Sequence, residues 1–123
     1  MTAYGKELII DLHICDSSTF TRKSIRKYFR LLCEQIEMKP EKLCWWDDYG
    51  MESEFQQTES HTKGTTAIQF ILTSNITIHT LDLLNNVYIN IFSCKDFDTD
   101  VARRFSEEWF KGKIVNSHII ERI

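Results

Sequence analysis

The chain is short of proline and glycine, with one proline and four glycines among its 123 residues. This composition excludes collagen-like chains and proline- or glycine-rich disordered chains. A basic stripe is also missing, because fifteen Lys and Arg are mixed among eighteen Asp and Glu and the net charge is −3. No apolar run is long enough to span a membrane, and residues 1–6 lack the apolar core of a signal peptide. We therefore expect a globular, cytoplasmic protein that binds neither nucleic acid nor membrane.

Cysteine and histidine are present, but not at the spacing of a metal site. The four cysteines include no Cys-x-x-Cys pair; they are Cys15, Cys33, Cys44 and Cys94. The histidines also lack ligand spacing; they are His13, His61, His79 and His118. We predict reduced thiols and no metal ion.

The first forty residues show one strand pattern and one helix pattern. Residues 7–14 alternate apolar and polar side chains, which predicts a half-buried strand. After the capping types at 16–18, apolar residues recur at steps of three and four until Pro40, which predicts a helix; they are Ile25, Phe29, Leu32 and Ile36.

Residues 41–47 predict a second strand, and a polar stretch without a clear period follows from Asp47 to Gly64. Loops of this length in a small domain are uncommon unless they are functional or mobile. A substrate-facing lid and plain disorder are both compatible with this segment.

The rest of the chain is mostly strand-like. Residues 66–94 are rich in β-branched and aromatic side chains and contain a hairpin around 82–86. A last helix carries Val101, Phe105 and Trp109 and stops at Gly112, and residues 114–120 predict a closing strand. A single domain over 1–123 follows, of α+β class: a two-layer sandwich with two helices on one face of a largely antiparallel sheet.

The hairpin brings chemistry-bearing side chains together. If it turns around Leu84, residue numbers that sum to 168 are paired, and Ser74 lies opposite Cys94 with Cβ atoms roughly 5 Å apart. His79 lies five residues from Ser74, so strict alternation places it on the other face. A bulge, a twist at Ser74 or a neighbouring copy of the chain must intervene if the three cooperate.

The same segment resembles the prokaryotic class of S-adenosylmethionine decarboxylases. Residues 73–80, Thr-Ser-Asn-Ile-Thr-Ile-His-Thr, look like that family's Glu-Ser-His-Ile-Ser-Ile-His-Thr motif. Residues 91–94, Ile-Phe-Ser-Cys, look like its Phe-Thr-Cys motif, at the same separation. Weaker similarity at 5–16 and 113–122 extends the resemblance over nearly the whole chain.

The resemblance implies a self-processing enzyme. Ser74 would attack the carbonyl of Thr73, and the chain would part into residues 1–73 and 74–123 with a pyruvoyl group at the new N-terminus. His79 would serve the proton transfers of processing. The pyruvoyl ketone would form a Schiff base with the amine of S-adenosylmethionine, and Cys94 would protonate the carbanion left by decarboxylation, in a pathway to spermidine. Family members are dimers, so a homodimer is implied.

The pocket motif of the family is altered. Leu81-Asp82-Leu83 replaces Trp-Pro-Glu, whose carboxylate grips a ribose, and Thr73 and Asn75 replace glutamate and histidine. Trp45, Trp46 and Phe55 are candidate aromatic surfaces for adenine or a sulfonium, although aromatic residues of this kind are more often core or interface residues. Two alternatives therefore stand: a pyruvoyl enzyme for another amino acid, such as arginine or ornithine, and an unprocessed, non-catalytic partner subunit.

Overall fold

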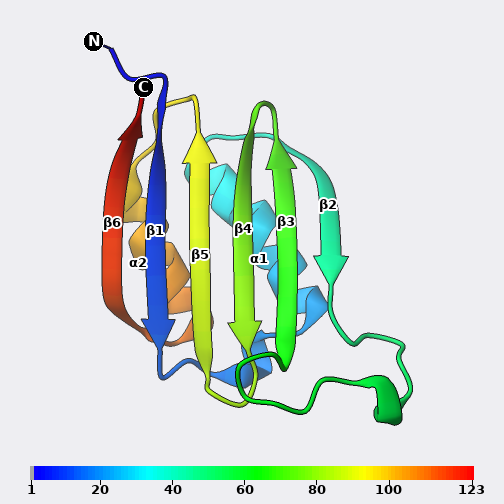
Figure 1. Cartoon of the computed structure of the whole chain (residues 1–123). Coiled ribbons are helices and arrows are strands. Elements are labelled where there is room, and N and C mark those ends of the chain that lie inside the picture. The colour runs from blue at the N-terminus through cyan, green and yellow to red at the C-terminus, as the bar shows by residue number, and fades with distance from the viewer. Residues whose placement is uncertain (1) are drawn as a thin grey trace.

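A computed structural model describes residues 2–123 as two helices packed on one face of a six-stranded sheet (Figure 1). The predicted α+β sandwich is confirmed. All neighbouring strands are antiparallel, in the order β2-β3-β4-β5-β1-β6. The strands are β1 (Gly5–His13), β2 (Pro40–Trp46), β3 (Gly64–Ile71), β4 (Ser74–Leu81), β5 (Asn86–Ser93) and β6 (Lys113–Arg122). The helices are α1 (Arg22–Gln35) and α2 (Thr99–Phe110), with 3₁₀ turns η1 (Ser17–Thr19) and η2 (Ser53–Phe55).

The core lies between the sheet and the two helices. Alternate residues of the three central strands are fully buried; they are Leu8, Ile10, Leu12, Ile76, Ile78, Val87, Ile89 and Ile91. The apolar stripe of α1 packs against them with Ile25, Phe29 and Leu32. The opposite face of the sheet is covered by no element of the described chain, as Figure 1 shows with both helices behind the sheet.

The helix boundaries differ slightly from the sequence prediction. Asp16 caps the short turn η1 rather than the long helix, and Thr21 caps α1 through a hydrogen bond from the Ser24 amide to its hydroxyl. Helix α2 ends at Phe110, and Lys111, which precedes Gly112, takes the left-handed conformation. A Cβ atom at Gly112 would collide with Cys15 Sγ and lie 3.0 Å from the His13 carbonyl oxygen, so the close packing there favours glycine.

The predicted register of the β4–β5 hairpin is wrong by one residue. Strands β4 and β5 pair residues whose numbers sum to 167, so Asn75 faces Phe92, and the register continues to Ser74 opposite Ser93. The turn is centred half a residue earlier than Leu84, because β4 continues to Leu81 and β5 begins at Asn86. Cys94 follows the end of β5 instead of pairing with Ser74.

The polar stretch between β2 and β3 extends from the end of the sheet opposite the β3–β4 turn (Figure 1). Two ion pairs hold its ends: the first joins Asp47 to Arg22 of α1, and the second joins Asp48 to Lys63 within the segment itself. Arg22 donates two hydrogen bonds to the Asp47 carboxylate, at 2.7 and 2.8 Å, and Lys63 Nζ lies 3.2 Å from Asp48 Oδ2. The segment is therefore held by specific contacts, which favours an ordered loop over plain disorder.

Candidate functional site

Ser74 begins β4 and points toward the helix-covered face of the sheet, where it is 7% exposed. Its hydroxyl oxygen accepts a hydrogen bond from the Cys94 backbone amide at 3.3 Å. The same hydroxyl donates toward Ser93 Oγ at 3.5 Å, and Ser93 in turn donates to the Lys95 carbonyl at 2.8 Å. These contacts fix the direction of the Ser74 side chain.

Cys94 lies beside Ser74 despite the shifted register. Its Sγ is 3.9 Å from Ser74 Oγ and 3.1 Å from Thr73 Oγ1. Hydrogen bonding from Thr73, followed by that from Ser74, lowers the pKa of the Cys94 thiol, and desolvation opposes this shift. The predicted meeting of Ser74 and Cys94 is thus present in the structure, through the strand end and not through a cross-strand pair.

Thr73 occupies the two-residue turn between β3 and β4 with a left-handed backbone, φ 51°. This conformation is rare for a β-branched residue and is reserved for tight turns or strained sites. Its carbonyl carbon belongs to the peptide bond that precedes Ser74, so the candidate cleavage site lies in a strained turn.

His79 is separated from this pair. It lies five residues along β4, about 16 Å at strand spacing, with its side chain on the uncovered face. Its Nδ1 is 3.0 Å from the hydroxyl of Thr66 on β3, and desolvation lowers the pKa of its imidazole. Within one chain the structure therefore brings Ser74 and Cys94 together and leaves His79 apart.

Sequence analysis missed Thr66. The two-residue turn at 72–73 pairs β3 and β4 positions whose numbers sum to 145, which places Thr66 opposite His79. A hydroxyl on Nδ1 fixes the ring orientation and leaves Nε2 free for proton transfer. Recognition of that short turn would have found the pair.

The structure separates the three candidate aromatic residues. Trp46 is 62% exposed and lines a hollow of about 400 Å³ on the uncovered side, together with Thr66, His79 and Tyr88. Trp45 instead lies under the guanidinium groups of Arg22 and Arg26. Phe55 is in η2, outside the hollow. Trp46 is the one beside His79.

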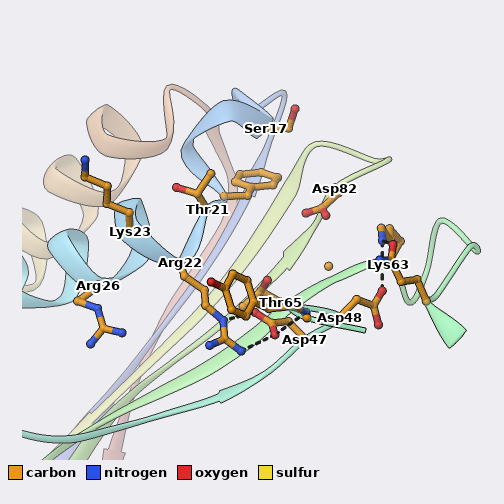
Figure 2. A pocket seen from close by; sticks show the side chains of 15 residues that line it. Ser17, Thr21, Arg22, Lys23, Arg26, Asp47, Asp48, Lys63, Thr65 and Asp82 are labelled. Carbon is orange, nitrogen blue, oxygen red and sulfur yellow. Dashed lines mark hydrogen bonds and ion pairs between the residues drawn. The ribbon is translucent and has the colours of Figure 1, made fainter. Parts of the chain in front are cut away.

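Asp82 does not replace the missing family carboxylate at this hollow. It lines a different cavity of about 1020 Å³, between the start of α1 and the 47–64 segment. In Figure 2, dashed lines mark the interactions of Arg22 and Lys63, and none reaches Asp82. Its Oδ1 is buried without a hydrogen bond. Burial raises the pKa of the Asp82 carboxyl, against the attraction of Lys63.

Two further features bear on the site. Among residues 2–123, no group of three His, Cys, Asp or Glu side chains is arranged to hold a metal ion. No helix of the described chain is long and apolar enough to cross a membrane.

The fold and the serine–cysteine pair define a class of protein: an antiparallel α+β sandwich with a hydroxyl nucleophile candidate and a thiol at one end of its central strands. A family model described as S-adenosylmethionine decarboxylase matches residues 6–123, and the chain belongs to this family. The crystal structure of the adenosylmethionine decarboxylase from Aquifex aeolicus VF5 has the same fold, with a TM-score of 0.78 and 17% identity over 99% of this chain and 92% of that chain. No curated protein sequence matches.

Proposed function

We propose that the chain is a pyruvoyl-dependent decarboxylase of the prokaryotic class that processes itself at the Thr73–Ser74 bond and converts S-adenosylmethionine to its decarboxylated form for polyamine synthesis. The observation that carries the proposal is the cluster at the start of β4, where Ser74 Oγ lies 3.9 Å from Cys94 Sγ beside a left-handed Thr73. Family membership supplies the substrate class.

Processing follows from groups that the chain itself carries. Ser74 Oγ attacks the Thr73 carbonyl carbon, the peptide C–N bond breaks, and the nitrogen of residue 74 takes up the proton, which leaves an ester. Loss of the α-proton then expels the Thr73 carboxylate together with Oγ. The resulting enamine tautomerises, and water hydrolyses the imine to release ammonia and leave a pyruvoyl group. Serine is required because its hydroxyl both attacks and departs.

The residues at the start of β4 fit such a group. Cleavage would leave it at the N-terminus of β4, within reach of Cys94, and a pyruvoyl ketone supplies an electron sink for decarboxylation. The thiol then has one task, to hold a proton and deliver it to the substrate carbon after carbon dioxide has left.

His79 needs a second copy of the chain to take part. Its side chain, with that of Thr66, lies on the sheet face that no element of the described chain covers. Apolar side chains share this face, among them Ile9 and Phe92. We infer a homodimer that packs through this face, in which His79 of one copy serves the proton transfers of processing in the other.

Trp46 is the aromatic surface proposed for the substrate. An exposed indole face attracts a sulfonium cation and also stacks with adenine. Its place beside His79 and Tyr88 puts this surface in the same hollow as the proton-transfer group.

The proposal is tested by the intact mass of the purified protein under denaturing conditions. We expect fragments 1–73 and 74–123, the second with the mass of an N-terminal pyruvoyl group, and neither fragment in Ser74→Ala. The matched control is Ser53→Ala, at an exposed serine of η2, which should cleave normally. A stable full-length wild-type chain would contradict both decarboxylase functions and favour the unprocessed partner subunit.

A second substrate class is favoured by one observation. Among the described residues, no carboxylate lines the hollow that Trp46 and His79 share, which includes Leu81 and not Asp82; Glu7 lines a separate hollow that also includes His79. Loss of a ribose-holding carboxylate favours a substrate without a ribose, such as arginine or ornithine. Carbon dioxide release from each of the three substrates by the cleaved protein separates the two assignments.

A further inference from the structure

Thr73 makes two hydrogen-bond contacts with its hydroxyl at the candidate cleavage site. Its Oγ1 donates to the preceding Leu72 carbonyl at 2.8 Å and also lies 3.1 Å from Cys94 Sγ. Thr73 has a left-handed backbone because the turn has only two residues to connect β3 and β4. With this backbone its side chain contacts the Cys94 thiol. The residue that would be cut is therefore in direct contact with the residue that would act as the acid.

The contact suits either protonation state of Cys94. A protonated thiol can donate to Thr73 Oγ1 while the Thr73 hydroxyl donates to Leu72. When the sulfur carries a negative charge, the Thr73 hydroxyl can turn and donate to it instead. Hydrogen bonds to charged groups are the stronger kind, so the contact favours the thiolate.

We propose that Thr73 is a positioning residue that holds Cys94 in the uncut chain, and that cleavage of the Thr73–Ser74 bond releases Cys94 from it. The second half rests on the proposed self-processing. Once the bond is cut, Thr73 is the last residue of its fragment, the turn no longer constrains its backbone, and its hydroxyl is free to leave the sulfur.

The release would change the role of the thiol. In the uncut chain a thiolate beside Ser74 Oγ can receive the hydroxyl proton as that oxygen attacks the Thr73 carbonyl. After cleavage the loss of the Thr73 hydrogen bond raises the pKa of Cys94, which leaves the thiol protonated and fit to act as the acid. One cysteine would thus serve as a base before processing and as an acid afterwards.

Five titratable side chains line the shallow pocket that also includes Cys94. They are Tyr4, Lys6, Lys95, Asp96 and Glu121. Lys6 is paired with Asp96, and Lys95 donates to the Glu37 carbonyl. None of these contacts involves Thr73, so substitutions there leave the groups in place.

The test uses full-length Ser74→Ala protein, which cannot process, so its outcome does not depend on self-cleavage. The pH profile of iodoacetamide alkylation at Cys94, followed by peptide mass, gives the midpoint of thiol ionisation. Thr73→Val keeps the β-branched shape and removes the hydroxyl, and we expect it to raise the midpoint by roughly one pH unit, the effect of one hydrogen bond to a charged group. Thr73→Ser should retain the parent midpoint.

Thr73→Gly is a second variant without the hydroxyl, and glycine accepts the left-handed backbone, so it covers a failure of Thr73→Val to fold. It should match Thr73→Val. Midpoints in both variants equal to that of the parent would overturn the proposal. In the cleaved wild-type protein we expect the midpoint of Cys94 ionisation to be raised, as in the two variants. A low midpoint there would overturn the release of Cys94 on cleavage, and it would leave the contact in the uncut chain unaffected.

Discussion

At the scale of single residues, the proposed chemistry of the site depends on the thiol of Cys94. Three contacts define its surroundings: the Thr73 hydroxyl, the Ser74 hydroxyl and the hydrogen bond from its own amide to Ser74. Cys15 and Cys33 differ from it, since burial raises the pKa of each thiol to about 11. Cys94 alone combines a lowered pKa with a hydroxyl nucleophile candidate as neighbour.

Replacement of this thiol tests the acid step when activity is counted per cleaved chain, because processing itself is expected to slow as well. In Cys94→Ser, a hydroxyl is too weak an acid at neutral pH, so decarboxylation per cleaved chain should fall by roughly 100-fold or more. The measurement is carbon dioxide release, normalised to cleaved protein by mass. Cys44→Ser, on the edge strand β2, is the matched control and should keep full activity. Equal activity of both variants would remove Cys94 from the mechanism.

His79 should make stability depend on pH. Its folded pKa lies below the ordinary value of 6.5 because of desolvation, so the unfolded chain binds the proton more readily. The contribution of neutral His79 to the free energy of unfolding is fully present above pH 6.5, and it is lost as the pH falls toward the pKa of His79 in the folded chain. The free energy of urea unfolding should therefore fall between pH 7 and pH 5.5, less steeply in His79→Gln. His118→Gln, at an exposed position on β6, should follow the wild type; identical slopes for all three chains would refute the assignment.

At the scale of elements, α1 and the 47–64 segment are joined by one ion pair. The Asp47 side chain is 7% exposed and accepts both hydrogen bonds of the Arg22 guanidinium, and this pairing lowers the pKa of the Asp47 carboxyl. The pair connects the helix start to the loop at one edge of the cavity in Figure 2. We expect this ion pair to hold the loop in place beside both the cavity and the His79 hollow.

Asp47→Asn should loosen that loop. The neutral amide leaves Arg22 without its charged acceptor, and we expect a loss of about 2 kcal/mol in the free energy of unfolding, within the range for hydrogen bonds to charged groups. Limited proteolysis should cut within residues 48–62 sooner than in the wild type. Asp96→Asn disrupts an ion pair whose carboxylate is 92% exposed and should leave the free energy of unfolding almost unchanged. Equal effects of the two variants would show that the anchor contributes no more than a surface pair.

At the scale of the whole molecule, the protein has two layers and one bare sheet face. The helices bury one side of the sheet, whereas the other side presents His79, Thr66 and Trp46 together with apolar residues. A sheet face with this mixture is suited to a partner surface. The proposed homodimer would cover it and supply the histidine that a single chain leaves far from Ser74.

The dimer predicts a solution mass of twice 14.6 kDa by sedimentation. Ile9→Lys places a charge on the uncovered face and should shift the protein toward monomer and slow self-cleavage, because His79 of the second copy would be lost. Leu83→Lys, at an exposed residue of the β4–β5 turn, is the control and should remain dimeric. A monomeric wild-type chain that still cleaves itself would exclude a role for the second copy.

The local sequence pattern alone predicted the type of several elements and the candidate site residues. Alternation at 7–14 and the three- and four-residue steps from Ile25 to Ile36 predicted β1 and α1, because these signals depend on neighbouring residues. The same local signals at 66–94, with the motif resemblance, indicated Ser74, His79 and Cys94.

Only the tertiary structure decided how these residues meet. A one-residue shift of the β4–β5 register placed Ser93 rather than Cys94 opposite Ser74, and turn geometry sets register. The sequence likewise did not show Thr66 on His79, Trp46 in the hollow or Asp82 turned away from it. Such contacts join strands and loops distant in sequence, so no local periodicity encodes them, and they follow only when the sheet order and the packing of the loop are known.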